Sequence, residues 1–228
     1  MAIVGIDTLS LLDYEDKVAC VIFFKACNFR CPFCHNGTSV LEAIDSIDFQ
    51  EVIDSLKKRI GLIDAVVFSG GEPTLERDIV NKIKRVKDLG FLVKLDTNGT
   101  KPEVIEKLLD EQLVDYIAMD IKNSPALYAK TSGVNRVDLD SIKKSIALII
   151  KRAPDYEFRT TLVKEFHELM DVEQYLALIK GAKKLYLQKF VDREECFQKG
   201  LHEVDILEAE RLKEILKDVI PRVELRGY

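Results

Sequence analysis

The chain has 228 residues, a net charge of −5 and 47% hydrophobic residues, enough for a sizeable core in one folding unit. This charge balance, with no basic stripe, argues against a nucleic-acid-binding surface. No segment has the length and apolar character of a transmembrane helix, and the first residues lack a basic stretch followed by an apolar one. We therefore expect a soluble, cytoplasmic protein with neither nucleic-acid nor membrane partners.

Short β-branched or aromatic runs alternate along the chain with amphipathic stretches of helical period. The predicted strands are Val18–Phe24, Ala65–Ser69, Leu92–Asp96, Tyr116–Asp120, Glu157–Leu162 and Lys184–Phe190. The predicted helices are Phe49–Arg59, Arg77–Leu89, Pro102–Glu111, Leu139–Lys151, Val172–Lys180 and Ile206–Val219, and a short run, Arg222–Leu225, closes the chain. Six strand–helix units with short connections predict an α/β fold, a mostly parallel sheet with outer helices in the form of a partial (β/α)6 TIM-like barrel. No linker interrupts the pattern, so we expect residues 1–228 to form a single domain.

Polar and glycine-rich segments follow the predicted strands. In chain order they are the cysteine-rich loop 25–36, Ser69–Pro73, Asp96–Gly99, Met119–Lys122, Arg159–Thr161 and the surroundings of Gln188. Each segment alone is compatible with ordinary turn chemistry. Because the carboxyl ends of parallel strands meet at one rim, where α/β enzymes place their sites, six such segments in phase predict one functional site.

Three cysteines, Cys27, Cys31 and Cys34, lie within the ten residues Cys27–Asn36, in the spacing C-x3-C-x2-C. Thiolates select soft metals and are the usual ligands of iron–sulfur clusters. A four-iron cluster normally takes four cysteines, so three leave one iron open for a ligand. A zinc site completed by His35 is the alternative, although neighbouring side chains of Cys34 and His35 are poorly placed to bind one ion together.

The other two cysteines are too few to hold a second four-iron cluster. Cys20 lies inside a predicted strand and is expected to be a small core residue. Cys196 could be an exposed thiol near the rim. His167 and His202 have no neighbours at metal-ligand spacing, so they are expected at the surface or at helix ends.

The cysteine spacing, with Phe33 before the third cysteine, resembles the signature of the radical S-adenosylmethionine (SAM) superfamily. The resemblance continues through Gly70-Gly71-Glu72-Pro73 and the later strand ends. The run Phe23–Asn36 is most similar to the activating enzymes of glycyl radical proteins, such as the activases of pyruvate formate-lyase and anaerobic ribonucleoside-triphosphate reductase. Asp96-Thr97-Asn98-Gly99 and Asp120-Ile121-Lys122 are similar to later motifs of the same group.

This resemblance implies one 4Fe-4S cluster held by the three cysteines, with SAM bound at its open iron. Reductive cleavage of SAM would give a 5′-deoxyadenosyl radical that abstracts hydrogen from a glycine of a partner glycyl radical enzyme. A one-electron donor such as flavodoxin or ferredoxin would supply the electron. The residues expected to bind the cofactor are Phe33, Cys34, His35, Gly70, Gly71, Glu72, Asp96, Thr97, Asn98, Asp120, Ile121, Lys122, Arg159 and Gln188.

Among these residues, the two glycines have no side chains, so backbone can come close to a bound ligand. Asp120 and Lys122 are two residues apart and should share one face of an extended strand; facing outward, they would form only a solvated ion pair.

The chain departs from the activase pattern at Asp13–Lys17, where a glycine-rich stretch is common, and at Ala26, where glycine is frequent. These differences concern the protein partner more than the SAM chemistry. Two other functions stay open: a radical SAM enzyme acting on a small molecule, such as a 7-carboxy-7-deazaguanine synthase, and a non-catalytic iron–sulfur or zinc-binding module. The second would leave the motifs at the later strand ends without a purpose.

Overall fold

The computed structural model describes residues 1–37 and 45–228. Its strands are β1 (Ile3–Ser10), β2 (Ala19–Phe24), β3 (Ala65–Gly70), β4 (Leu92–Thr97), β5 (Tyr116–Asp120), β6 (Tyr156–Leu162), β7 (Lys184–Lys189) and β8 (Arg222–Arg226). Its helices are α2 (Phe49–Lys57), α3 (Ile79–Lys87), α4 (Pro102–Asp110), α5 (Tyr128–Thr131), α6 (Leu139–Arg152), α7 (Lys164–His167), α8 (Val172–Leu178) and α9 (Ile206–Lys217), with a 3-10 turn, η1, at Pro73–Leu75.

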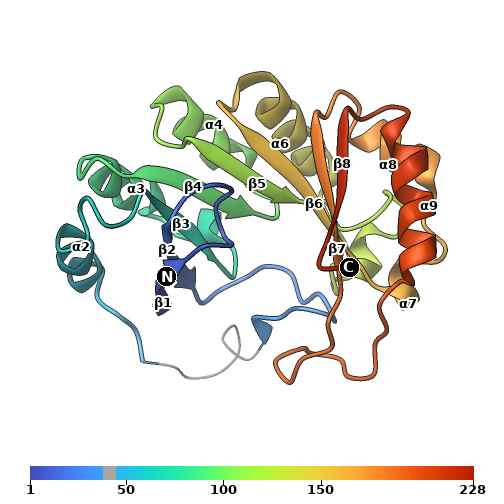
Figure 1. The fold of residues 1–228 in the computed structure, drawn as a ribbon, viewed down its shortest axis with the longest axis horizontal. Coiled ribbons are helices and arrows are strands. Elements are labelled where there is room, and N and C mark those ends of the chain that lie inside the picture. Colours follow the sequence, from blue (N-terminus) through green and yellow to red (C-terminus); the bar gives the residue numbers. More distant parts are fainter. Residues whose placement is uncertain (38–44) are drawn as a thin grey trace.

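The eight strands form one sheet in which neighbours in the chain are also neighbours in space, from β1 to β8. β1 pairs antiparallel with β2, and every later pair is parallel. Figure 1 shows the sheet as an arc with the long helices on its outer side and the loop after β2 crossing the inner side. Because β1 and β8 end the strand order and do not pair, the barrel is open.

Aspartates fix the start of four helices. Asp48, Asp138, Asp171 and Asp205 each accept a hydrogen bond from a backbone N–H of the first turn of α2, α6, α8 and α9. Such caps satisfy N–H groups that have no partner inside the helix. The helices therefore begin at positions set by the local sequence, and their apolar faces pack on the sheet.

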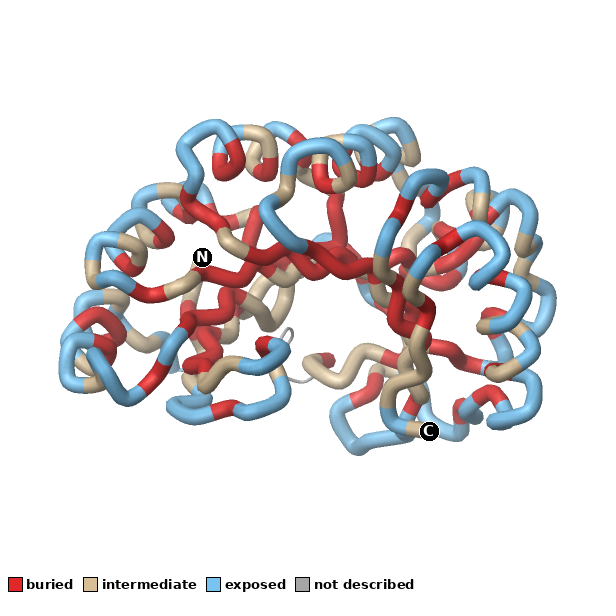
Figure 2. The backbone as a smooth tube through the Cα atoms, turned by 45° about the horizontal axis from the view of Figure 1, so that its top comes forward, coloured by how far each residue is buried: buried red, intermediate tan, exposed pale blue. Residues whose placement is uncertain are grey.

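The two faces of the sheet have different side chains, because successive strand residues point to opposite sides. On β2, Cys20 and Ile22 belong to the large core that also contains the buried faces of the helices. Ala19 and Val21 belong instead to a second, smaller cluster with Ala65 and Val67 of β3, Tyr116 and Ala118 of β5, and Tyr14. Figure 2 shows the central strands of the arc largely buried, whereas the edge strands β1 and β8 are mostly intermediate or exposed. The small side chains of β2 and β3 on the inner face leave room for the polar residues near the strand ends.

The predicted α/β partial barrel is confirmed. The run Arg222–Leu225 forms β8, a seventh parallel strand. β1 was not predicted: Gly5 and Asp7 interrupt its apolar pattern, and its pairing with β2 is irregular at two places. In the described part of the chain, no helix has the length and apolarity needed to cross a membrane.

Candidate functional site

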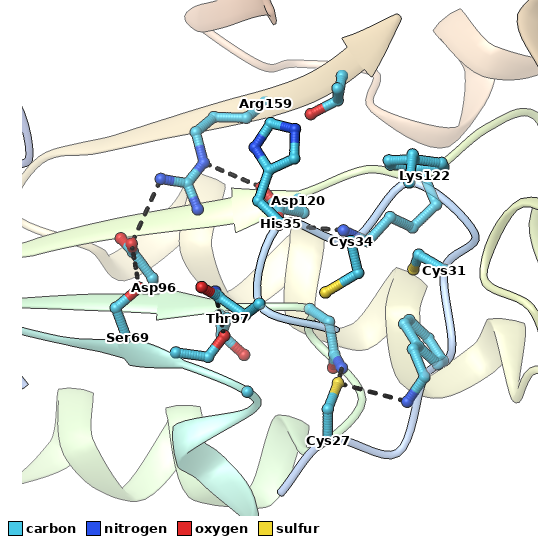
Figure 3. A pocket seen from close by; sticks show the side chains of 17 residues that line it. Cys27, Cys31, Cys34, His35, Ser69, Asp96, Thr97, Asp120, Lys122 and Arg159 are labelled. Atoms are coloured by element: carbon cyan, nitrogen blue, oxygen red, sulfur yellow. Dashed lines mark hydrogen bonds and ion pairs between the residues drawn. The ribbon is translucent and has the colours of Figure 1, made fainter. Parts of the chain in front are cut away.

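A cavity of about 190 Å³ opens at the carboxyl ends of the parallel strands. One part of its wall is the loop after β2, which contributes Cys27, Phe29, Cys31, Phe33, Cys34, His35 and Asn36. The strand ends contribute Ser69, Gly70, Gly71, Asp96, Thr97, Asn98, Asp120, Lys122, Arg159 and Thr161. Figure 3 shows Asp96 and Arg159 on one side of this space and Cys31 and Cys34 on the other, with Lys122 beside these two cysteines.

The cysteine loop is held by backbone hydrogen bonds from three separate segments. Glu72 N–H donates to Ala26 O (2.7 Å), Arg30 N–H donates to Ser132 O (2.9 Å), and Gln198 N–H donates to Pro32 O (2.9 Å). The Arg30 guanidinium also donates to the carbonyls of residues 27 and 29 (2.5 and 2.7 Å). An irregular loop supported in this way presents its thiols in a fixed arrangement.

Burial makes the three thiols poor acids while they have no metal partner. It raises the pKa of Cys27 to about 11 and that of Cys31 to about 12, and it also raises the pKa of Cys34. The nearby Lys122 ammonium opposes this effect at each of the three thiols. Metal ligation requires the thiolate, so a cationic metal group would stabilise this set of sulfurs.

The donor set fits a cluster better than a single ion. Within residues 1–37 and 45–228, no three His, Cys, Asp or Glu side chains converge closely enough to bind one metal ion. In an iron–sulfur cluster each cysteine binds a different iron, so the sulfurs stand further apart than around one zinc ion. The same lack of a converging set among the described residues disfavours the alternative of a zinc site completed by His35.

Four charged residues at the strand ends, Asp96, Asp120, Lys122 and Arg159, form a connected group. Arg159 Nε donates to Asp120 Oδ1 (2.9 Å), and its Nη1 lies 3.4 Å from Asp96 Oδ2. Lys122 Nζ donates to Asp120 Oδ2 (3.1 Å). Burial alone would raise the pKa of Asp120, but Arg159 and Lys122 lower it to about 2. Asp120 raises the pKa of both cations against the effect of burial, so all three groups stay charged.

The two carboxylate oxygens of Asp96 have different partners. Its Oδ2 accepts a hydrogen bond from Ser69 Oγ (2.9 Å). Its buried Oδ1 has no hydrogen-bond partner among the described residues, and Lys94 Nζ stands 3.7 Å away. A buried acceptor without a donor is costly. The hydroxyl or amino group of a bound molecule would satisfy it, and a zwitterionic molecule with a ribose, such as SAM, carries both.

The two glycines serve the protein's own backbone. A Cβ on Gly71 would lie 2.2 Å from Ala26 O, and one on Gly70 would lie 2.4 Å from Phe24 N. Gly70 also has a positive φ of 102°. The sequence suggested a close approach to a ligand; both glycines line the cavity, but the tightest approach is to the chain that leads into the cysteine loop.

Thirteen of the predicted site residues line the cavity, and three do not: Glu72, Ile121 and Gln188. Glu72 is buried and accepts hydrogen bonds from Thr97 Oγ1 (2.8 Å) and Asn98 N (2.6 Å), so it braces the end of β4. Ile121 is fully buried in the core. Gln188 of β7 pairs in the sheet between β6 and β8, outside the cavity wall.

The predicted set lacked four residues that line the cavity: Phe29, Asn36, Ser69 and Thr161. Two of these could have been predicted from the sequence. Ser69 precedes Gly70 at a strand end, and Thr161 shares its strand face with Arg159. Phe29 and Asn36 lie in an irregular loop, whose side-chain directions no periodicity predicts.

One expectation outside the cavity, an exposed Cys196, needs correction. Cys196 is buried rather than exposed, within the core. His167 ends α7, as expected, and is buried: its Nε2–H donates to Lys122 O (2.9 Å), and its Nδ1 accepts from the backbone N–H of Val163 (3.1 Å). Burial lowers the pKa of His167, so the neutral ring supports the backbone at the end of β5. Cys20 is a core residue, as predicted, and His202 is exposed.

Comparisons with known proteins agree with this geometry. The model of the Radical SAM superfamily matches residues 21–179. A Methanocaldococcus jannaschii protein, provisionally named a glycyl-radical enzyme activating enzyme, is 36% identical over 97% of this chain and 94% of its own length. The 7-carboxy-7-deazaguanine synthase of Thermococcus kodakarensis is 30% identical over 70% of this chain and 58% of its own.

Solved structures share the fold. Streptococcus suis SuiB bound to the precursor peptide SuiA has a TM-score of 0.68 at 16% identity, over 90% of this chain and 47% of that one. A structure of TYW1 with a lysine-pyruvate adduct has a TM-score of 0.61 at 17% identity, over 88% of this chain and 73% of that one. The family match, the full-length relative and the three-cysteine cavity together show that this chain belongs to the radical SAM superfamily.

Proposed function

We propose that this chain is an activating enzyme that uses SAM and a 4Fe-4S cluster to remove a hydrogen atom from a glycine of a partner glycyl radical enzyme. The observation that carries the proposal is the match to the Methanocaldococcus jannaschii protein, which covers almost the whole of both chains. Small-molecule enzymes of the superfamily match a smaller share of this chain or of their own.

The charges in the cavity support a substrate without phosphates or additional carboxylates. Its wall contains two cations, Lys122 and Arg159, and two carboxylates, Asp96 and Asp120. Each cation forms an ion pair with at least one of the two carboxylates. Burial lowers the pKa of His35, which keeps that ring neutral. Among the described wall residues no cation is therefore left unmatched for an anionic second substrate, whereas the neutral backbone around a glycine needs none.

Some residues of the site would bind the cluster and SAM, and others would exclude water from them. When bound, the cluster and SAM supply one-electron cleavage of the sulfonium and hydrogen abstraction. Cys27, Cys31 and Cys34 would hold the cluster and leave one iron free for SAM. The charged residues at the ends of β4, β5 and β6 would hold its ribose and amino-acid groups. Phe33, packed against the rings of residues 166 and 190 (centroids 5.8 and 6.4 Å away), would exclude water.

A radical SAM enzyme of the 7-carboxy-7-deazaguanine synthase type is the second candidate, on the strength of the 30% identity to such an enzyme. The matched charges of the cavity disfavour it. In either case the electron would come from a one-electron donor protein of the flavodoxin or ferredoxin type.

Anaerobic incubation with a partner tests the proposal. Reconstituted, reduced protein is mixed with SAM and with radical-free anaerobic ribonucleotide reductase or pyruvate formate-lyase of the same organism. We expect the electron paramagnetic resonance doublet of a glycyl radical with one of them, and none with the Cys31→Ala variant. SAM cleavage without a glycyl signal from either partner would overturn the proposal and favour a small-molecule substrate.

A further inference from the structure

A second layer of charged residues lies directly beneath the cavity, inside the barrel. Lys94 precedes Asp96 by two residues on β4, and Glu157 precedes Arg159 by two on β6, so each pair shares the inner face of the sheet. Lys94 and Glu157 do not line the cavity. Their side chains are 5% and 2% exposed, although charged residues are rarely so deeply buried without a function or a partner.

This lower layer, Lys94 and Glu157, is in contact with the upper layer, the charged residues of the cavity wall. Arg159 Nη1 lies 3.9 Å from Glu157 Oε1, in addition to its contacts with Asp96 and Asp120. Lys94 Nζ lies 3.7 Å from Asp96 Oδ1 and 4.0 Å from Glu157 Oε1. Ala118 is the residue in register between Asp96 and Glu157, so only a methyl group separates them on the sheet.

Glu157 itself is fixed from two sides. The guanidinium of Arg226, on β8, donates to both of its oxygens (3.2 and 3.1 Å) and stacks on the ring of Tyr186 (3.7 Å to the centroid). Tyr116 donates its hydroxyl to Glu157 Oε2 (3.0 Å). Burial would raise the pKa of Glu157, but Arg159, Arg226 and Lys94 together lower it, so the carboxylate is charged. A bidentate arginine and a tyrosine leave this carboxylate little freedom to move.

We propose that Glu157 is a positioning residue for the cofactor site: it holds Arg159 and Lys94 in place, and Arg226 of the last strand anchors it. Glu157 does not touch the cavity; it acts through the Arg159 guanidinium. This inference rests on the proposed function only in placing SAM in the cavity.

The consequence of losing this charge follows from the contacts. Without the Glu157 carboxylate, Asp96 is the one carboxylate within 4 Å of Lys94 among the described residues. Lys94, already 3.7 Å from Asp96 Oδ1, is then drawn closer to that oxygen, while Arg159 keeps the other oxygen, Oδ2. A close ion pair with Lys94 makes Oδ1 unavailable to a ligand.

Three variants test the proposal through SAM binding measured by equilibrium dialysis on the reconstituted, anaerobic protein, without any partner enzyme. Glu157→Gln keeps the shape and removes the charge. Glu76→Gln is the matched control, since Glu76 is also a buried carboxylate paired with a lysine (Lys82, 3.5 Å), but its partners, unlike Arg159, lie outside the cavity wall. Arg159→Lys removes the group through which Glu157 is proposed to act.

We expect Glu157→Gln to raise the SAM dissociation constant about tenfold, the lower end of the effect of groups that orient ligating residues. Its iron content should match the wild type. Glu76→Gln should bind SAM normally even if it is equally destabilised. In the Arg159→Lys background, adding Glu157→Gln should change binding less than twofold. Unchanged SAM affinity in Glu157→Gln, or a full additional tenfold loss in the double variant, would overturn the proposal. No SAM binding by the wild type would instead count against the proposed function.

Discussion

Gly71 lies at the site, as its motif predicted, but the contact that requires a glycine there is not visible in the sequence. The motif Gly70-Gly71-Glu72-Pro73 indicated a place where backbone meets a ligand. The structure adds that the hydrogen of Gly71 faces Ala26 O, directly before the first cysteine. The position of this residue at the site was predictable from the strand end; its contact with residue 26, distant in sequence, was not.

Gly71→Ala is expected to disturb the cysteine loop as well as SAM binding. The added methyl group must push Ala26 O away, at a cost of about 1–3 kcal/mol. Reconstituted protein should hold less iron than the wild type and bind SAM more weakly. Gly5→Ala is the control, because its Cβ would meet only ordinary contacts at 3.6 Å. Full iron content in the Gly71 variant would contradict the assigned contact.

Asp120 and Lys122 form the ion pair that their spacing predicted. Lys122→Met removes a charged hydrogen bond worth about 1.5–3 kcal/mol, so the SAM dissociation constant should rise at least tenfold. Iron content should not change. Combined with Asp120→Asn, the losses should be less than additive, as for two groups acting as one unit. Additive losses, measured by equilibrium dialysis, would mean that the two residues act separately.

At the scale of elements, the segment 190–205 between β7 and α9 is the part that the sequence did not reveal. It packs against the cysteine loop: Gln198 N–H reaches Pro32 O, and a Cβ on Gly37 would lie 2.2 Å from Glu195 O. The alternation of strands and helices was readable because each element has its own period. An irregular segment has none, and its contacts depend on the finished fold.

His35→Ala should loosen this segment. The His35 ring stacks on Phe190 (5.9 Å between centroids) and bonds to Val191 O, and both contacts are lost in the variant. Limited trypsin digestion should then cleave faster at Arg193 and Lys199, while circular dichroism stays unchanged. His202→Ala is the control, because an exposed pair with Glu165 contributes little. Equal cleavage rates in the two variants would show that His35 does not secure the segment.

At the scale of the whole molecule, the inner face of the barrel changes from small apolar residues near β2 and β3 to charged ones from β4 to β8. The charged residues of the cavity wall lie at or near strand ends, so they could be predicted. The lower layer could not, because Lys94 and Glu157 occupy strand interiors where the period alone does not say which face is buried. Their roles depend on pairings across several strands.

The buried charge of Glu157 should also appear in the stability of the metal-free protein. Its pKa in the folded state lies below the ordinary 4.5, so the stabilisation is present above that value and is lost as the pH falls through the folded pKa. Glu157→Gln should lower the free energy of unfolding in urea at pH 7 by about 1–3 kcal/mol. That deficit should shrink below pH 4.5. A deficit of the same size at all pH values would show that the charge is not its cause.

The most direct test follows a single hydrogen atom. A glycyl radical enzyme whose glycines carry deuterium on the α-carbon is incubated anaerobically with the reduced, reconstituted protein and unlabelled SAM. If this chain removes a glycine hydrogen by way of SAM, mass spectrometry of the 5′-deoxyadenosine produced should find one deuterium per molecule, and its formation should depend on the partner. Unlabelled 5′-deoxyadenosine, formed at the same rate with and without the partner, would contradict the proposed activity.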